Sequence, residues 1–220
     1  MNKKVKTSEL YENVPQLLKP YFDRTTYPWE LLSEIKNIIK EFLENGIEGF
    51  TLYADGILIG EGVKIHPNAV IEPPAILGAG TELRPGAFLR GNVICGEGCV
   101  IGNSTELKNC ILLDRVQVPH YNYVGDSILG YRAHMGAGSI CSNLKSDGKN
   151  VVIRGEEPIE TGLRKIGGIL ADFADIGCGS VLNPGTVIGK NTSVYPLTSL
   201  RGVYPENSIV KDTKTVVPRK

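Results

Sequence analysis

Large aliphatic side chains recur at every sixth position over much of the chain. A small or β-branched residue follows four positions after each of the first eight of them, from Val63 to Thr105. A period of six fits neither an α-helix nor an alternating strand, and it is typical of a hexapeptide parallel β-helix, in which each side of a triangular coil uses one six-residue unit. We therefore expect an all-β solenoid with corners of Gly, Asn or Asp. The inward positions are Ile59, Ile65, Ile71, Leu77, Leu83, Leu89, Cys95, Ile101 and Leu107.

The same pattern divides the chain into segments. We expect a helical segment at residues 1–46, the hexapeptide-repeat β-helix at 47–207 and a tail at 208–220. The repeat register slips by one residue after Leu107 and again before Leu129, and residues 142–169 fit no repeat at all. A loop of this length inside a compact domain is usually functional or disordered, and we predict a hairpin through Val151 to Arg154 within it.

The N-terminal segment has a helical rather than a hexapeptide pattern. Tyr27-Pro28-Trp29-Glu30 opens a predicted helix, apolar residues follow at three- and four-residue spacing, and Gly46 is a suitable C-terminal cap. A shorter helix is predicted around Ser8 to Lys19. The apolar stripe favours packing over the first open coil, which needs a cap, and docking to a partner is the alternative.

Composition narrows the function classes. Lys plus Arg and Asp plus Glu number 24 each, which gives no support for nucleic acid or a polybasic membrane anchor. No apolar run approaches the length of a membrane span, and the N-terminus lacks the apolar region of a secretory signal. Five cysteines, an odd number, and three scattered histidines argue against a disulfide framework or a metal site. We expect a cytoplasmic protein that needs no metal.

Polar residues that can carry chemistry concentrate around the first register slip. His120 lies there among aromatic and amide groups, and a neutral imidazole is the side chain best matched to accept a proton near pH 7. Glu106, one unit upstream, would orient the ring or stabilise its protonated form. A structural corner role for His120 is the alternative, and His134 is a second candidate base.

A coil of about 18 residues stacks residues that far apart on one face. Arg90 and Lys108 have this separation and would form a positive ladder beside Glu106, suited to a phosphate. Lys149, in the insertion, would close over the same anion. A solvated charged face is the alternative interpretation.

These motifs resemble a known family. The resemblance is to the acetyltransferase half of bifunctional N-acetylglucosamine-1-phosphate uridyltransferases, and the long insertion is closer to the archaeal sugar-1-phosphate branch. It covers about residues 50–205. The matching runs are Arg84-Pro-Gly-Ala87, Ile101-Gly-Asn-Ser-Thr-Glu-Leu-Lys108, His120-Tyr-Asn-Tyr-Val-Gly-Asp126 and Met135-Gly-Ala-Gly-Ser-Ile-Cys-Ser-Asn143, followed by Asp147-Gly-Lys149.

The resemblance implies a fold, an oligomer and a set of roles. The family is a trimeric left-handed β-helix that moves an acetyl group from acetyl-CoA to the amine of glucosamine 1-phosphate. His120 would be the general base with Glu106 as its partner, and Asn143 would contact the sugar amine or the acetyl group. Two groups of residues complete the site: Lys108, Tyr123 and Lys149 on the sugar phosphate, and the backbone near Ala137, Cys178 and Pro196 along a CoA groove between subunits.

The phosphate-binding arginine has two candidates. The Arg-Pro-Gly-Ala motif selects Arg84, whereas the one-coil spacing to Lys108 selects Arg90. The spacing is the better guide, because contact follows space. His134 stands where the family usually has Asn, which leaves the acceptor sugar open.

We hypothesise a CoA-dependent N-acetyltransferase acting on an amino sugar 1-phosphate or a nucleotide amino sugar. A homotrimer is expected, because coil faces expose apolar residues that one chain cannot cover. About 46 residues precede the repeats, so nucleotidyl transfer by this chain is not expected. The alternative is a non-catalytic module related to UDP-N-acetylglucosamine pyrophosphorylases, which binds a sugar nucleotide or partners a separate nucleotidyltransferase.

Overall fold

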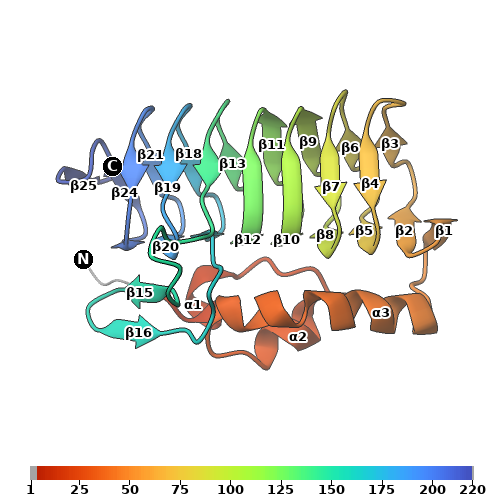
Figure 1. Ribbon diagram of the computed structural model, residues 1–220, viewed down its shortest axis with the longest axis horizontal. Coiled ribbons are helices and arrows are strands. Elements are labelled where there is room, and N and C mark those ends of the chain that lie inside the picture. Colours follow the sequence, from red (N-terminus) through yellow and green to blue (C-terminus); the bar gives the residue numbers. More distant parts are fainter. Residues whose placement is uncertain (1–3, 220) are drawn as a thin grey trace.

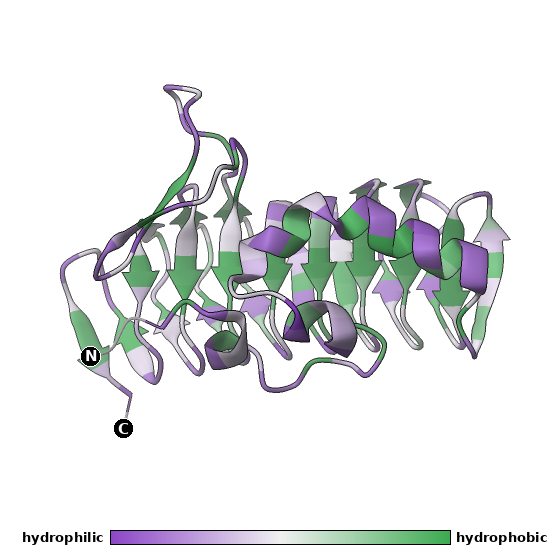
Figure 2. Ribbon diagram, turned by 90° about the horizontal axis from the view of Figure 1, so that it is seen from below, coloured by the Kyte–Doolittle hydropathy of each residue, from purple (hydrophilic) through white to green (hydrophobic). Residues whose placement is uncertain are grey.

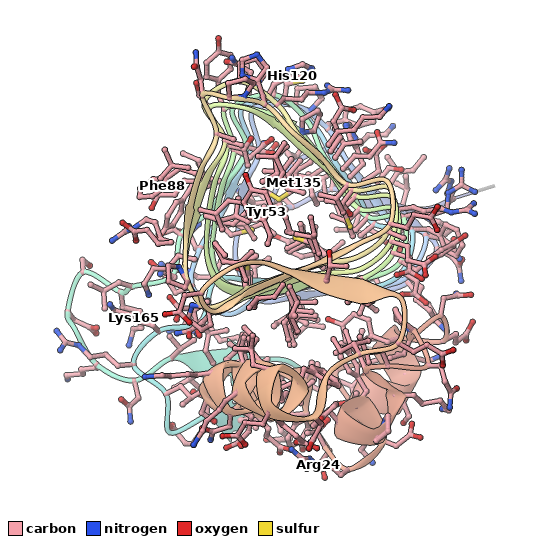
Figure 3. The ribbon with its side chains drawn as sticks, turned by 90° about the vertical axis from the view of Figure 1, so that its right-hand side faces the viewer. Arg24, Tyr53, Phe88, His120, Met135 and Lys165 are labelled. Atoms are coloured by element: carbon pink, nitrogen blue, oxygen red, sulfur yellow. The ribbon has the colours of Figure 1, made fainter. Side chains whose placement is uncertain are left out.

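The computed structural model describes residues 4–219 and contains a triangular solenoid (Figures 1 and 3). Seen end-on in Figure 3, the chain descends the left-hand face, which is the front face of Figure 1. It then crosses the bottom and rises on the right-hand face, the rear face of Figure 1, while it moves away from the viewer. The predicted left-handed parallel β-helix is therefore confirmed. Front, bottom and rear refer below to the view of Figure 1.

Short parallel strands form the three faces. The rear face carries β3 (Lys64–Ile65), β6 (Glu82–Leu83), β9 (Val100–Asn103), β11 (Gln117–His120), β13 (His134–Met135), β18 (Asp175–Ile176), β21 (Ser193–Val194) and β24 (Ser208–Val210). The front face carries β4 (Val70–Glu72), β7 (Phe88–Arg90), β10 (Glu106–Leu112), β12 (Tyr123–Leu129), β14 (Ile140–Cys141), β19 (Val181–Leu182) and β22 (Ser199–Leu200). The bottom face carries β2 (Ile57–Gly60), β5 (Ala75–Leu77), β8 (Val93–Cys95), β17 (Gly168–Leu170), β20 (Thr186–Ile188) and β23 (Val203–Tyr204), together with the later halves of β10 and β12.

Antiparallel strands flank the coils at both ends. β1 (Phe50–Ala54) pairs with β2, and β25 (Val216–Pro218) pairs with β24. Inside the coils, the six-residue periodicity stacks equivalent side chains, so Leu83 pairs with Ile101 and Leu107 with Val124. These stacks form a continuous buried interior. Each buried Leu, Ile or Val contributes about 1.5–3 kcal/mol to stability.

The two register slips lie at the edge between the front and bottom faces. There β10 and β12 run around the corner without a break, with Asn109 at φ 48° and Asp126 at φ 47°. The coil before them uses two corner residues, Gly91 and Asn92, at the same place. The slip is thus the loss of one corner residue, and left-handed Asn and Asp are the side chains that tolerate such a corner best.

The N-terminal segment contains short elements that lie along the bottom face (Figure 2). They are α1 (Thr7–Leu10), α2 (Lys19–Asp23), the 3₁₀ helix η1 (Pro28–Ser33) and α3 (Ile35–Asn45). The helix predicted around Ser8 to Lys19, with breaks at Pro15 and Pro20, is present only as the single turn of α1, and the chain from there to α2 is not helical. Pro20 instead lies in the first turn of α2, where its missing N–H costs nothing.

This helical layer covers a lateral face, so its interpretation as an end cap is wrong. Buried side chains of η1 and α3, among them Leu31 and Ile38, pack on an apolar row that points outward from the bottom strands. The row runs through Leu58, Ile76, Ile94, Ile111, Ile128, Ile169, Val187 and Val203. One chain therefore covers this face itself, which removes the bottom face from the argument for a trimer.

The insertion completes the same layer. β15 (Val152–Arg154) and β16 (Pro158–Glu160) form an antiparallel hairpin, and Val151, Ile153 and Ile166 are buried against the bottom face. Buried Asp172 anchors the N-terminal segment next to it, because its carboxylate accepts backbone hydrogen bonds from Glu12 at 2.9 Å and Asn13 at 3.0 Å.

Candidate functional site

A ladder of charged side chains crosses the front face near the register slips. Arg90 Nη1 donates to Glu106 Oε1 at 2.6 Å, and Lys108 lies two residues beyond Glu106 on the same outward face. Because Leu89 pairs with Leu107, Arg90 and Lys108 are neighbours across the strands, as the one-coil spacing predicts. The cationic side chains of Arg90 and Lys108, on adjacent coils, therefore project from the same face.

Asp126 is the buried acid at the centre of this cluster. Its side chain is almost inaccessible, and its carboxylate accepts Asn143 Nδ2 at 2.5 Å, Asn109 Nδ2 at 3.0 Å and Lys108 Nζ at 3.3 Å. The Asn109 amide also donates to Leu32 O of the helical layer at 3.1 Å. Asp126 thus joins two front-face coils to the insertion and, through Asn109, to the helices.

Tyr123 and Asn143 meet above a glycine. Asn143 Nδ2 lies 3.2 Å from the Tyr123 hydroxyl, which accepts its hydrogen bond. A Cβ on Gly125 would lie 2.4 Å from that hydroxyl and 2.8 Å from Asn143 Nδ2, so no larger residue leaves this bond intact. Burial, followed by the charge of Asp126, raises the pKa of Tyr123, so the hydroxyl stays protonated at neutral pH.

His120 lies at the upper edge, where the rear and front faces meet. Figure 3 shows its side chain at the apex, pointing away from the interior that holds Met135. The buried Asn122 fixes this corner: its Oδ1 accepts the His120 backbone N–H at 3.1 Å, and its Nδ2 donates to Gly136 O at 2.8 Å. The imidazole is therefore exposed on a rigid corner.

The expected partnership between Glu106 and His120 differs from what the structure contains. The Glu106 carboxylate binds Arg90, and within residues 4–219 no hydrogen bond joins it to His120. The Glu106 carboxylate pairs with Arg90 because Arg90 lies on the neighbouring coil of the same face. The second candidate, His134, lies on the rear face, where its Nδ1 is 2.8 Å from Asp175 Oδ1.

The residues implied for a CoA groove follow the His120 edge toward the C-terminal coils. Successive backbone hydrogen bonds connect them: Gly138 N to His120 O at 3.0 Å, Gly179 N to Ala137 O at 2.8 Å, and Leu197 N to Cys178 O at 2.9 Å. Ala137, Cys178 and Pro196 therefore occupy one line along the upper edge. Exposed apolar side chains flank it: Tyr121, Ile140, Tyr195 and Leu197.

The two remaining predicted phosphate ligands contact other residues. Arg84 is on the rear strand side and pairs with Glu82 at 3.2 Å, not with the front-face cluster. Lys149 is exposed in the insertion, and its backbone N–H donates to Asp147 Oδ1 at 3.0 Å. Of the arginine candidates, the structure brings Arg90 and not Arg84 to Glu106.

Sequence reasoning assigned no role to Asp126, Asn109 or Gly125. The one-residue register slip at this corner was the available signal. The slip alone does not predict these contacts, because they depend on the corner geometry, which places Asn109 and Asp126 within hydrogen-bond distance of each other.

The cysteines differ sharply in burial. Burial raises the pKa of the Cys99 and Cys141 thiols to about 12, and Cys95 and Cys110 are also buried, whereas Cys178 is exposed. Within residues 4–219 no group of three or more His, Cys, Asp or Glu side chains is placed to hold a metal ion. Across the same residues, every helix is too short or too polar to cross a membrane.

Comparison with known sequences supports the fold and the resemblance. The family "Bacterial transferase hexapeptide (six repeats)" matches residues 56–91, and "GMPPB C-terminal domain" matches residues 78–162. The "Bifunctional protein GlmU" of Methanococcus maripaludis strain S2 is 31% identical over 207 residues, covering 92% of this chain and 50% of the relative. That of Methanococcus aeolicus is 35% identical over 203 residues, covering 91% and 49%.

A third relative carries the other name expected for this branch. The "Bifunctional sugar-1-phosphate nucleotidylyltransferase/acetyltransferase" of Sulfurisphaera tokodaii is 29% identical over 174 residues, covering 77% of this chain and 43% of the relative. The chain thus spans about half the length of the curated relatives it matches. The predicted resemblance to these bifunctional proteins is confirmed.

Two matches among solved structures are an acetyltransferase domain and an N-acyltransferase. The acetyltransferase domain of PglB from Neisseria gonorrhoeae, in complex with acetyl coenzyme A, is 15% identical, with a TM-score of 0.36, and the match covers 83% of this chain and 63% of that one. AntD, an N-acyltransferase from Bacillus cereus in complex with dTDP-4-amino-4,6-dideoxyglucose and coenzyme A, is 18% identical, with a TM-score of 0.40, and covers 77% and 82%.

Proposed function

We propose that this hexapeptide-repeat relative of the GlmU-type proteins transfers an acetyl group from acetyl-CoA to the amine of an amino sugar 1-phosphate or a nucleotide amino sugar. The observation that carries the proposal is the front-face cluster. Arg90, Lys108, Tyr123 and Asn143 lie together on adjacent coils, and β12, which begins at Tyr123, follows the corner of His120.

The cluster has the chemistry of an anionic sugar site. Arg90 supplies a planar fork of donors and Lys108 a point charge, which together suit a phosphate. The Tyr123 hydroxyl and the Asn143 amide supply directional hydrogen bonds for sugar hydroxyl or amide groups. The Glu106 and Asp126 carboxylates hold the two cations in place before a ligand binds.

His120 is proposed as the general base. At neutral pH a sugar amine is protonated, and it must lose a proton before it attacks the thioester carbonyl. The nitrogen then bonds to the carbonyl carbon, the C–S bond breaks, and CoA leaves as the thiol after it takes up a proton. Direct transfer needs no acyl-enzyme, which agrees with the burial of four of the cysteines.

The upper edge is the proposed location of acetyl-CoA. Ala137, Cys178 and Pro196 form a line from the His120 corner toward the C-terminal coils, and backbone N–H and C=O groups along such an edge suit an extended pantetheine arm. The exposed Tyr121, Ile140, Tyr195 and Leu197 beside this line support a homotrimer in which neighbouring chains form the groove. Light scattering tests the trimer.

The decisive experiment measures N-acetylated product by mass spectrometry, with purified protein, acetyl-CoA and a panel of amino sugar 1-phosphates and nucleotide amino sugars. His120→Ala should lower the rate by about 10²–10⁴-fold. His66→Ala is the matched control, since His66 is an exposed rear-strand corner histidine several coils earlier. A larger loss of rate with His134→Ala than with His120→Ala would indicate that His134, on the rear face, is the general base.

Absence of product with every acceptor would contradict the proposal. Saturable binding of a sugar nucleotide without turnover would support the non-catalytic module instead. Docking of a separate nucleotidyltransferase through the apolar stripe of the N-terminal helices is disfavoured, because that stripe is buried against the bottom face.

A further inference from the structure

A second polar cavity lies at the edge between the bottom and rear faces, toward the C-terminal coils. Its volume is about 640 Å³, and it is widely open to solvent. Arg132, Phe173, Asn191 and Asn207 line it from successive coils, and Arg219 lines it from the segment that follows β25. It shares no residue with the front-face cluster or the His120 edge.

The corner residues that line this cavity adopt a backbone conformation that disfavours side chains. On the first coils the edge position is glycine, at Gly62, Gly80 and Gly98, with φ between 62° and 69°. Later coils place Arg132 at φ 54° and Phe173 at φ 60° in the same position. A left-handed L-residue is less favourable than glycine, and the later coils nevertheless carry side chains at this corner, including Arg115 outside the cavity.

The cavity offers two arginines that no carboxylate of the described residues holds at ion-pair distance. Within residues 4–219 Arg132 makes no ion pair, and Arg219 donates through Nη1 to Asn191 O at 3.2 Å while its charge acts on Asp175. The one acidic residue of the lining, Asp175, is held by His134 at 2.8 Å. Two guanidinium groups facing one cavity are suited to phosphate oxygens.

Phe173 adds a flat apolar surface beside these cations. The residue is 38% exposed, and its ring packs edge-on against Tyr131, with centroids 5.4 Å apart and an interplanar angle of 85°. An exposed ring fixed in this way can stack on a nucleobase. The amides of Asn191 and Asn207, which bond to each other at 3.2 Å, add donors and acceptors for ribose hydroxyls or base edges.

We propose that this cavity binds a nucleotide, with its phosphates on Arg132 and Arg219 and its base on Phe173. The site lies on a different edge of the solenoid from His120 and the acetyl transfer proposed there, and His134, the alternative base, is among its lining residues.

Isothermal titration of the purified chain with ADP tests the site, with inorganic phosphate and adenosine as partial ligands. Arg132→Gly should weaken binding of both ADP and phosphate by about tenfold or more. Phe173→Leu should weaken ADP and adenosine but leave phosphate unchanged. Because Gly fits the left-handed corner, the thermal midpoint of Arg132→Gly should equal or exceed that of the wild type, which excludes misfolding as the cause of weaker binding.

Arg115→Gly is the matched control. Arg115 occupies the same corner one coil earlier, at φ 60°, and does not line the cavity. ADP affinity should stay within about threefold of the wild type in this variant, because a cation outside the cavity is screened by water and salt. Undetectable ADP binding, or binding that Arg132→Gly and Phe173→Leu leave unchanged, overturns the proposal; the latter result would place ADP at another site, such as the upper edge.

Discussion

The Asp126 carboxylate accepts a 2.5 Å hydrogen bond from the side-chain amide of Asn143. Asn143 belongs to the start of the insertion, and Asp126 to a corner one coil earlier, so this bond fixes where the insertion leaves the solenoid. The insertion returns at the same point, because Ile166 N donates to Asn143 O at 3.1 Å and Gly167 N to Asp126 O at 2.7 Å. Both ends of the insertion therefore lie against the candidate sugar site.

We predict that Asp126→Asn is destabilising and impairs acceptor binding. The new amide would direct a donor at the donors of Asn109, Asn143 or Lys108, which leaves buried polar groups unpaired and costs about 1–3 kcal/mol. Urea unfolding measures the first effect, and KM for the phosphorylated acceptor should rise as Lys108 and Asn143 lose their fixed positions. Asp147→Asn, an exposed change in the insertion, should alter neither quantity.

Arg90→Gln should raise KM for a phosphorylated acceptor by about tenfold, and Arg84→Gln should change it much less. The reason is position, since Arg90 lies beside Lys108 whereas Arg84 pairs with Glu82. Both arginines are substantially exposed, so neither change should alter stability much. Steady-state kinetics with varied acceptor distinguishes the two. The opposite order of effects would restore the motif-based choice of Arg84.

Thiol labelling should distinguish the exposed Cys178 from the four buried cysteines. In the native protein a disulfide reagent should react rapidly at Cys178, because this side chain is exposed, and slowly with the four buried thiols, whose pKa values are raised by burial. All five should react after unfolding in urea. Prior acetyl-CoA should slow labelling of Cys178 in the wild type, and protection that fails at saturating acetyl-CoA would argue against a groove along the upper edge.

Ile39→Ala should destabilise the protein by about 2–5 kcal/mol, because this α3 side chain is fully buried in the layer against the bottom face. Leu52→Ala is the control, since Leu52 is 64% exposed on β1. Urea denaturation gives both values. A small effect of Ile39→Ala would mean that the helical layer detaches easily from the solenoid in solution.

The pair of His134 and Asp175 predicts a weak acid dependence of stability. The hydrogen bond from His134, aided by the charges of His134 and Arg219, lowers the Asp175 pKa below its ordinary value of 3.8. A lowered folded-state pKa contributes stability above the unfolded pKa, and this contribution disappears as the pH falls through the folded value. The stability difference between the wild type and Asp175→Asn should therefore decrease below about pH 4. The difference should be small, because both side chains are partly exposed.

The period-six positions were sufficient to predict the solenoid and the stacking of Arg90 beside Lys108, because side-chain direction follows from the repeat. The helical layer was harder to place. An amphipathic stripe such as that of α3 shows that an apolar face is covered, but it does not say which face. The outward row through Ile76, Ile94 and Ile111 was the missing half of that argument, since these residues lie between the inward positions of the repeat.

Side-chain pairing was the least predictable level. Glu106 has a cation one coil earlier and an imidazole at a corner of the following coil, and sequence spacing does not rank these partners. The structure pairs it with Arg90 at 2.6 Å. Lys149 shows the same limit, because its position depends on the path of a loop that has no repeat to fix it.

The contacts of Asp172 have a consequence for how the molecule assembles. Its carboxylate binds the backbone at Glu12 and Asn13, about 160 positions earlier in the chain. Residues 7–45 are synthesised before the coils that they cover. Their apolar side chains can therefore be buried only after the later coils have formed the surface against which they pack. Such long-range closure slows folding. The coils nearest the N-terminus can stack early, but the amphipathic segment that precedes them reaches its final place only when the last third of the protein has formed.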